Sequence, residues 1–197
     1  METPLNGPEH APLSCGKAVY LVVLLHGNGS DGNGMIDIGI DWGAPLNKAK
    51  FLAPHAPFSD SAEKQWLDRQ GDARPAAALL NAYLDEVLAS HRLDESHLAL
   101  VGFDDGAKLA LQVGLNRQVG AVVAVSGGSM PDAIGAKPPV LLAHDAASEQ
   151  QAKAFQAALA TNGIAASLLC KPGDYFGLDE EGIDLVAAFL RKSLADR

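Results

Sequence analysis

Gly102-Phe103-Asp104-Asp105-Gly106 is the stretch that decides the fold of this chain. An apolar run at residues 97–103 leads into it and a helix-favouring segment at 107–115 follows, which predicts a strand, a sharp turn and a helix. The two glycines let the backbone turn tightly enough to hold one side chain above the end of the strand. That side chain belongs to Asp104, so the question is what a carboxylate does there.

Strand and helix alternate along the rest of the chain. Residues 19–25 are a nearly unbroken apolar run, as expected of a strand buried on both faces of a parallel sheet. Residues 75–91 begin with proline and carry leucines at helical spacing, which predicts a helix. The same reasoning predicts strands at 50–53, 121–125, 140–143 and 166–170, and helices near 35–36 and at 149–161 and 180–193.

This alternation predicts an α/β protein with a mostly parallel central sheet and helices on both faces. Residues 1–16, rich in proline and polar residues, are expected to form a flexible lead-in, and residues 17–197 one domain. Ligands of such sheets bind at the carboxyl ends of the strands. The loops that follow the predicted strands should therefore converge on one site; they begin after Leu25, Phe103, Val125, Ala143 and Cys170.

Composition narrows the classes of partner. The net charge of −9 argues against nucleic acid and anionic membranes, because both require clustered Lys and Arg. No apolar run is long enough for a membrane span. Only Cys15 and Cys170 are present, which favours a reducing cytoplasm, although a bridge between them is an alternative. No nucleotide-binding or metal-ligand motif occurs, so we expect no cofactor, and the oligomeric state is left open.

Five further segments lie in order with the glycine-flanked turn. They are Leu25-His26-Gly27-Asn28-Gly29, Phe51-Leu52-Ala53-Pro54-His55-Ala56-Pro57, Gln65-Trp66-Leu67-Asp68, Ala124-Val125-Ser126-Gly127 and Lys171-Pro172-Gly173. Together with the turn, which resembles a Gly-Phe-Ser-Gln-Gly nucleophile elbow, they resemble the phospholipase/carboxylesterase family of α/β-hydrolases, which includes the acyl-protein thioesterases. The resemblance covers roughly residues 20–190 and implies an α/β-hydrolase domain without a lid domain.

The family's Ser, Asp and His catalytic triad is not matched in this sequence. Asp104 stands at the position of the nucleophile. Counting along the family pattern places Ser148 at the position of the acid and Phe176 at the position of the histidine. The resemblance therefore implies a hydrolase homologue that is catalytically degenerate and binds, if anything, a small molecule or a partner at the vestigial pocket.

Two interpretations of Asp104 follow. Aspartate is the nucleophile in other α/β-hydrolases, the haloalkane dehalogenases and epoxide hydrolases, but a histidine must then activate the water that cleaves the ester intermediate. His144, at a nearby strand end, is the unconventional base that this alternative needs. In the other interpretation the carboxylate is a charge at a helix amino terminus, favoured by the helix dipole and the free N–H groups.

The resemblance also assigns the remaining site positions. The backbone N–H groups of Asn28 and Asp105 stand where the family has its oxyanion hole, and backbone donors survive side-chain changes. The expected pocket lining consists of His26, Gly27, Trp66, Ser126, His144 and Tyr175, with a packing role equally open for Trp66 and Tyr175. Ser126 and Ser129 are the serines available as a replacement nucleophile, but neither lies in an elbow.

Overall fold

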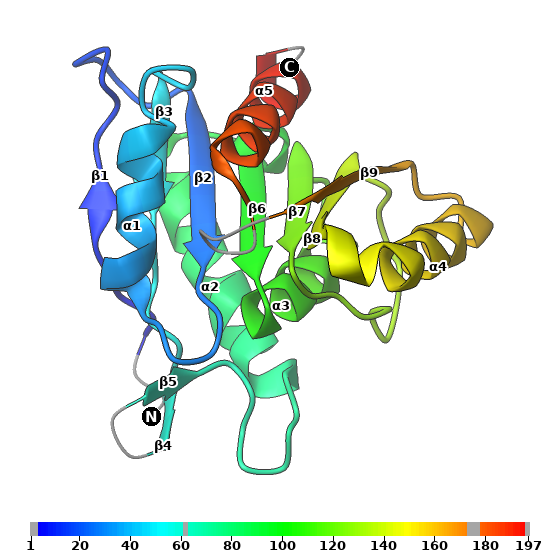
Figure 1. The fold of residues 1–197 in the computed structure, drawn as a ribbon. Helices are drawn as coiled ribbons and strands as arrows, with labels where there is room; N and C mark the ends of the chain where they lie inside the picture. The colour runs from blue at the N-terminus through cyan, green and yellow to red at the C-terminus, as the bar shows by residue number, and fades with distance from the viewer. Residues whose placement is uncertain (1–3, 61–62, 173–177, 196–197) are drawn as a thin grey trace.

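The computed structural model describes residues 4–60, 63–172 and 178–195. A seven-stranded sheet in the order β1-β3-β2-β6-β7-β8-β9 forms the middle of the molecule (Figure 1). Every neighbouring pair in this sheet is parallel except β1 and β3. The strands of this sheet are β1 (Glu9–His10), β2 (Tyr20–Leu25), β3 (Ala49–Leu52), β6 (Leu98–Phe103), β7 (Ala121–Val125), β8 (Val140–Asp145) and β9 (Ala166–Lys171).

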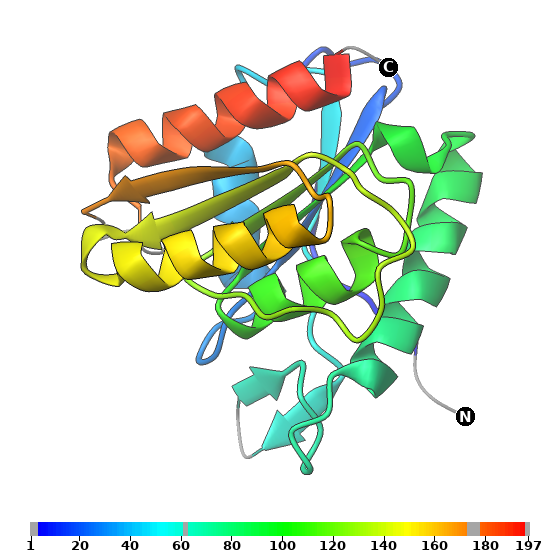
Figure 2. The ribbon, with the colours of Figure 1, turned by 90° about the vertical axis from the view of Figure 1, so that its right-hand side faces the viewer.

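Helices cover both faces of the sheet (Figures 1 and 2). They are α1 (Gly32–Asp41), α2 (Arg74–His91), α3 (Asp105–Gly114), α4 (Glu149–Thr161) and α5 (Glu180–Ala195), with short 3-10 turns η1 (Glu95–His97) and η2 (Ala146–Ser148). The apolar residues of α1 and α5 pack on one face, and those of α2, α3 and α4 on the other. No helix in the described ranges is long and apolar enough to cross a membrane.

Alternation of side chains along the central strands builds the two cores. In β2, Leu21, Val23 and Leu25 join the core under α2 and α3, whereas Val22 and Leu24 join the core under α1 and α5. Both sets are fully buried, because a strand covered by helices on both faces has no solvent-facing side. The predicted α/β architecture with a mostly parallel central sheet is confirmed.

Two parts of the chain differ from the sequence analysis. Residues 1–16 were expected to lack regular structure, but Glu9–His10 pair with the edge of β3 as strand β1, and Leu5 is buried. The open edge of β3 offers backbone hydrogen-bonding groups, and pairing through these groups leaves no side-chain pattern from which it could be predicted. The second difference is a small antiparallel sheet of β4 (Phe58–Asp60) and β5 (Glu63–Gln65), for which no strands were predicted.

Register brings three strand ends into one row. Phe103 in β6 lies beside Val125 in β7, and Val125 lies beside Ala143 in β8. The next residues in the chain are Asp104 after β6, Ser126 after β7, and His144, which is still within β8. The sheet therefore presents these three positions side by side at its carboxyl edge, where parallel sheets bind ligands.

Candidate functional site

The turn between β6 and α3 has the sharp geometry that its glycines predict. Asp104 has φ 51° and ψ −113°, a region that side chains rarely adopt, and its N–H donates to the carbonyl of Val125 at 2.9 Å. A Cβ on Gly102 would lie 2.1 Å from the carbonyl oxygen of Gly106, and one on Gly106 would lie 2.3 Å from that of Leu25. Both glycines are therefore required by close backbone approaches.

The Asp104 carboxylate is held out from this turn. The residue is exposed, and its side chain accepts no capping hydrogen bond from the N–H groups that begin α3. The expectation that those N–H groups bind the carboxylate directly is thus not met. The positive φ explains the difference, because an N-cap residue that satisfies these donors has an extended backbone.

The glycine-rich loop after β2 packs against this turn. A Cβ on Gly27 would lie 3.0 Å from the Cβ of Asp104 and 3.2 Å from the carbonyl oxygen of Phe103. Within the described residues, the N–H groups of Asn28 and Asp105 have no hydrogen-bond acceptor. Both positions adjoin the elbow, since Asn28 follows Gly27 and Asp105 follows Asp104.

A lysine that the sequence analysis did not identify stands next to these donors. Asp105 is buried, and its Oδ1 accepts from Lys108 Nζ at 2.6 Å. Residues three apart on a helix are neighbours, so the spacing of Asp105 and Lys108 is the sequence signal that could have identified this pair. The pair offsets the charge of the buried Asp105 carboxylate.

His26 and Trp66 are buried and hold the loops together. His26 is fully buried, its Nε2 accepts from the N–H of Ala56 at 3.1 Å, and its Nδ1 therefore donates to the Gly27 carbonyl at 2.9 Å. Trp66 is 1% exposed and donates from Nε1 to the carbonyl of His26 at 2.8 Å. Burial lowers the pKa of His26, so the neutral ring that this network needs is favoured.

His144 is a half-buried histidine at the end of β8. Its Nε2 is inaccessible and has no hydrogen-bond partner in the described part of the chain, and burial lowers its pKa. One strand lies between β6 and β8, so the Cα atoms of His144 and Asp104 are roughly 10 Å apart at normal strand spacing. Ser126 occupies the row between them, exposed and with φ 52°.

No histidine within the described residues, which include all six, hydrogen-bonds to Asp104. The ring nitrogens of His26 are both used, His55 Nδ1 accepts from the N–H of Gly32 at 3.1 Å, and His144 Nε2 bonds to nothing described. The three others lie in β1, at the end of α2 and in η1, and are His10, His91 and His97. In the sequence, no histidine follows His144.

The other sequence-predicted positions divide into two groups. Ser148 ends η2 and precedes α4, but its side chain caps none of that helix's N–H groups. Tyr175 and Phe176 lie outside the described residues. The predicted role of Phe176 at the histidine position thus rests on the sequence pattern.

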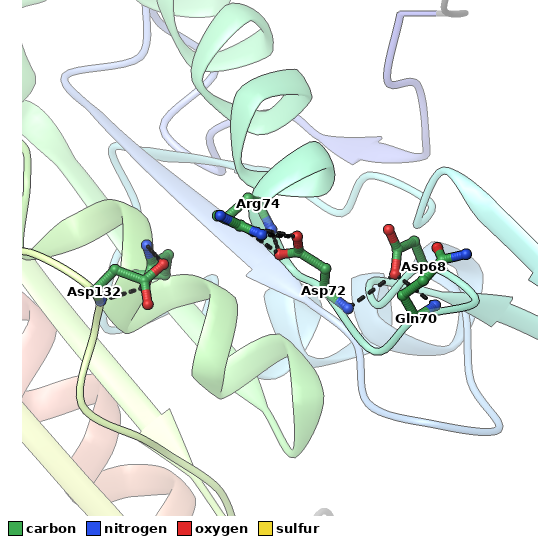
Figure 3. A network of polar contacts seen from close by, with 6 residues as sticks. Asp68, Gln70, Asp72, Arg74 and Asp132 are labelled. Carbon is green, nitrogen blue, oxygen red and sulfur yellow. Dashed lines mark hydrogen bonds and ion pairs between the residues drawn. The ribbon is translucent and has the colours of Figure 1, made fainter.

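A cavity of about 270 Å³ opens beside α3, between two loops. Asp68 shapes one loop by accepting from the N–H groups of Gln70 and Asp72, at 2.8 and 2.9 Å, and Asp72 pairs with Arg74 at 2.6 Å (Figure 3). On the other side of the cavity, the Asp132 N–H donates to Gln112 Oε1 at 3.1 Å (Figure 3). Leu67, Lys108, Ser129 and Met130 also line the cavity.

The described side chains give no indication of a metal centre or a disulfide. No group of three or more His, Cys, Asp or Glu residues among them is placed to hold a metal ion. Cys15 and Cys170 are both free thiols, so the alternative of a bridge between them is excluded.

The sheet order, the elbow and the glycine-rich loop define an α/β-hydrolase. The family model described as phospholipase/carboxylesterase matches residues 14–150, and the chain belongs to this family. No curated protein sequence shows a significant match.

Solved structures agree with this assignment. The structure of esterase PE8 is 33% identical in sequence, with a TM-score of 0.84, and the match covers 98% of this chain and 100% of that one. A carboxylesterase from Mesorhizobium loti is 18% identical, with a TM-score of 0.73 and coverage of 88% and 89%. SOBER1 from Arabidopsis thaliana is also 18% identical, with a TM-score of 0.75 and coverage of 89% and 99%. The last two show the shared fold alone.

Proposed function

We propose that this family member does not carry out ester hydrolysis and instead binds a small neutral carbonyl compound at the vestigial site. One observation carries the proposal: the elbow holds Asp104, and none of the six histidines, all within the described residues, hydrogen-bonds to its carboxylate. An ester formed on this aspartate would lack the base that activates water against it.

The chemistry of the elbow selects the charge of the ligand. The free N–H groups of Asn28 and Asp105 favour a carbonyl oxygen, as backbone donors do in an oxyanion hole. The exposed Asp104 carboxylate repels a ligand that is itself an anion. The site therefore suits an ester, thioester or amide carbonyl better than a free carboxylate. We expect it to act in a reducing cytoplasm, consistent with two free thiols.

Two isosteric probes test the proposal. The native protein, labelled with ¹⁵N, is titrated with butyramide and separately with butyrate. Butyramide should shift the amide signals of Asn28 and Asp105, and butyrate should bind at least tenfold more weakly. The charge-neutral variant Asp104→Asn should remove this difference. Equal binding of the two probes to the native protein, or shifts confined to other residues, would refute the proposed site.

One second candidate is an active hydrolase that uses Asp104 as the nucleophile and His144 as the base, which requires the buried, unpartnered Nε2 of His144 to become accessible to water. In that mechanism, Asp104 attacks the substrate carbon and expels the leaving group, and neutral His144 then takes a proton from the water that cleaves the ester. Single-turnover kinetics decides this. His144→Gln should trap an ester on Asp104, seen as added mass in the intact protein, if the candidate is right; an unmodified protein excludes it.

A further inference from the structure

A second cavity lies at the opposite end of the sheet from the elbow. It measures about 450 Å³ and is formed by the chain before β2, the first half of β3 and the end of α2. We call this space the basic cavity. It is lined by Ala11, Pro12, Gly16, Lys17, Ala18, Lys50, Ser90, His91 and Arg92. None of them belongs to the site described above.

Backbone contacts fix the walls of the basic cavity. The N–H groups of Ser14 and Val19 donate to the carbonyls of Asn47 and Lys48, each at 2.9 Å, and so tie the chain before β2 to the chain before β3. On the other wall, Arg92 ends α2 in the left-handed conformation, with φ 57°. A lysine-bearing segment and an arginine-bearing helix end thus border one preformed space.

Positive charge gathers here in a protein whose net charge is −9. Lys50 forms an ion pair with Glu9 at 2.8 Å. In the part of the chain that the structure describes, neither Lys17 nor Arg92 has an ion-pair partner. After the Lys50 pair is discounted, the cavity holds an excess of two positive charges.

His91 adds a ring nitrogen to this space. Its Nδ1 lies 2.9 Å from the Val87 carbonyl oxygen and 2.9 Å from Ser90 Oγ. In the tautomer whose Nδ1–H donates to that carbonyl, Nε2 is left for a ligand. The guanidinium of Arg92 supplies planar paired donors, whereas Lys17 supplies a point charge. This is a set of groups that recognises oxyanions.

We propose that the basic cavity binds the phosphate group of a small phosphorylated molecule. A phosphate monoester carries about −1.5 to −2 charges at pH 7, which matches the excess of two cations, while a carboxylate would neutralise only one. The volume falls within the range of roughly 300–1,000 Å³ typical of small-molecule sites. The same chemistry would also accept the phosphate of a lipid headgroup, so the experiment separates the two sources.

The test uses the full-length protein and two phosphate sources at constant ionic strength. Calorimetric titration with glycerol 3-phosphate measures the soluble source, and co-sedimentation with phosphatidylcholine vesicles that contain phosphatidic acid measures the lipid source. The variant Lys17→Gln with Arg92→Gln removes the two unpaired cations. Lys137→Gln with Arg191→Gln, at exposed positions elsewhere, is the control with the same change in net charge.

The native protein and the control should bind glycerol 3-phosphate saturably, and the cavity variant should bind it at least tenfold more weakly. Vesicle binding that depends on Lys17 and Arg92, without binding of the soluble probe, would keep the site and assign its phosphate to a lipid. Equal binding by the cavity variant and the control overturns the proposal. Failure of both probes to bind the native protein also overturns it.

Discussion

Replacement of Asp104 by glycine should give a more stable protein than replacement by alanine. The residue has φ 51° and ψ −113°, a conformation that costs a non-glycine residue about 1–3 kcal/mol. Its side chain is exposed and caps nothing, so its removal costs little packing. In a catalytic elbow such strain positions the nucleophile, whereas under the proposed loss of catalysis it serves no reaction.

The size of the effect follows from three contributions. Relief of strain adds about 1–3 kcal/mol to the free energy of unfolding. The greater freedom of glycine in the unfolded chain subtracts about 0.5–1 kcal/mol, and loss of a carboxylate at a helix amino terminus subtracts about 0.3–1 kcal/mol. Asp104→Ala loses only the carboxylate contribution, so Asp104→Gly should be about 1 kcal/mol more stable than Asp104→Ala.

Urea denaturation of both variants measures this difference, and thermal melting should show it as about 2–4 °C in a chain of this size. Ser129→Gly is the matched control, since Ser129 is exposed and has no positive φ. That variant should lose about 0.5–1 kcal/mol. If Asp104→Gly is no more stable than Asp104→Ala, the elbow is not strained and the reasoning fails.

Three further predictions concern stability. Burial lowers the pKa of His26 and His144 below 6.5, so the folded state binds fewer protons than the unfolded state. The free energy of unfolding should therefore fall as the pH drops through 6.5, which urea denaturation at pH 8 and 5.5 measures. An unchanged pH dependence in His144→Gln would remove His144 from the explanation. The Arg117 side chain is 12% exposed and pairs with Asp85 and Glu95, so Arg117→Met should cost about 2 kcal/mol of stability in urea denaturation. Arg74→Met, at an exposed ion pair, should cost less, and similar losses in the two variants would contradict this. Gly106→Ala places a Cβ 2.3 Å from the Leu25 carbonyl oxygen and should lower the free energy of unfolding by about 3 kcal/mol. Gly16→Ala, whose Cβ would have no atom nearer than 3.8 Å, should be neutral. Equal stability of the two variants would count against the close approach at Gly106.

The sequence predicted the parts of the fold that repeat a side-chain pattern. Strand β7 at Ala121–Val125 and helix α4 at Glu149–Thr161 were predicted to the residue, because their apolar spacing has one interpretation. Strand β1 was missed because two residues are too short for a pattern and its pairing comes from the backbone. The polar strands of the β4–β5 sheet were missed for the same reason.

The candidate site was predictable in position but not in contacts. The glycines around Asp104 predicted the turn, and the row of strand ends followed from the parallel sheet. The sequence left a pocket-lining role and a packing role equally open for Trp66. Its hydrogen bond to the His26 carbonyl, which the sequence could not indicate, supports packing. The pairing of Lys108 with Asp105 also depends on rotamers, which spacing alone does not fix.

The most direct test of the central claim is turnover itself. The measurement is kcat/KM for p-nitrophenyl butyrate and for a short acyl thioester, with the native chain and Asp104→Ala prepared in parallel. The account predicts that both proteins match the rate of the buffer alone. Turnover by the native chain that disappears in Asp104→Ala would show that the elbow aspartate is catalytic, and would contradict the account.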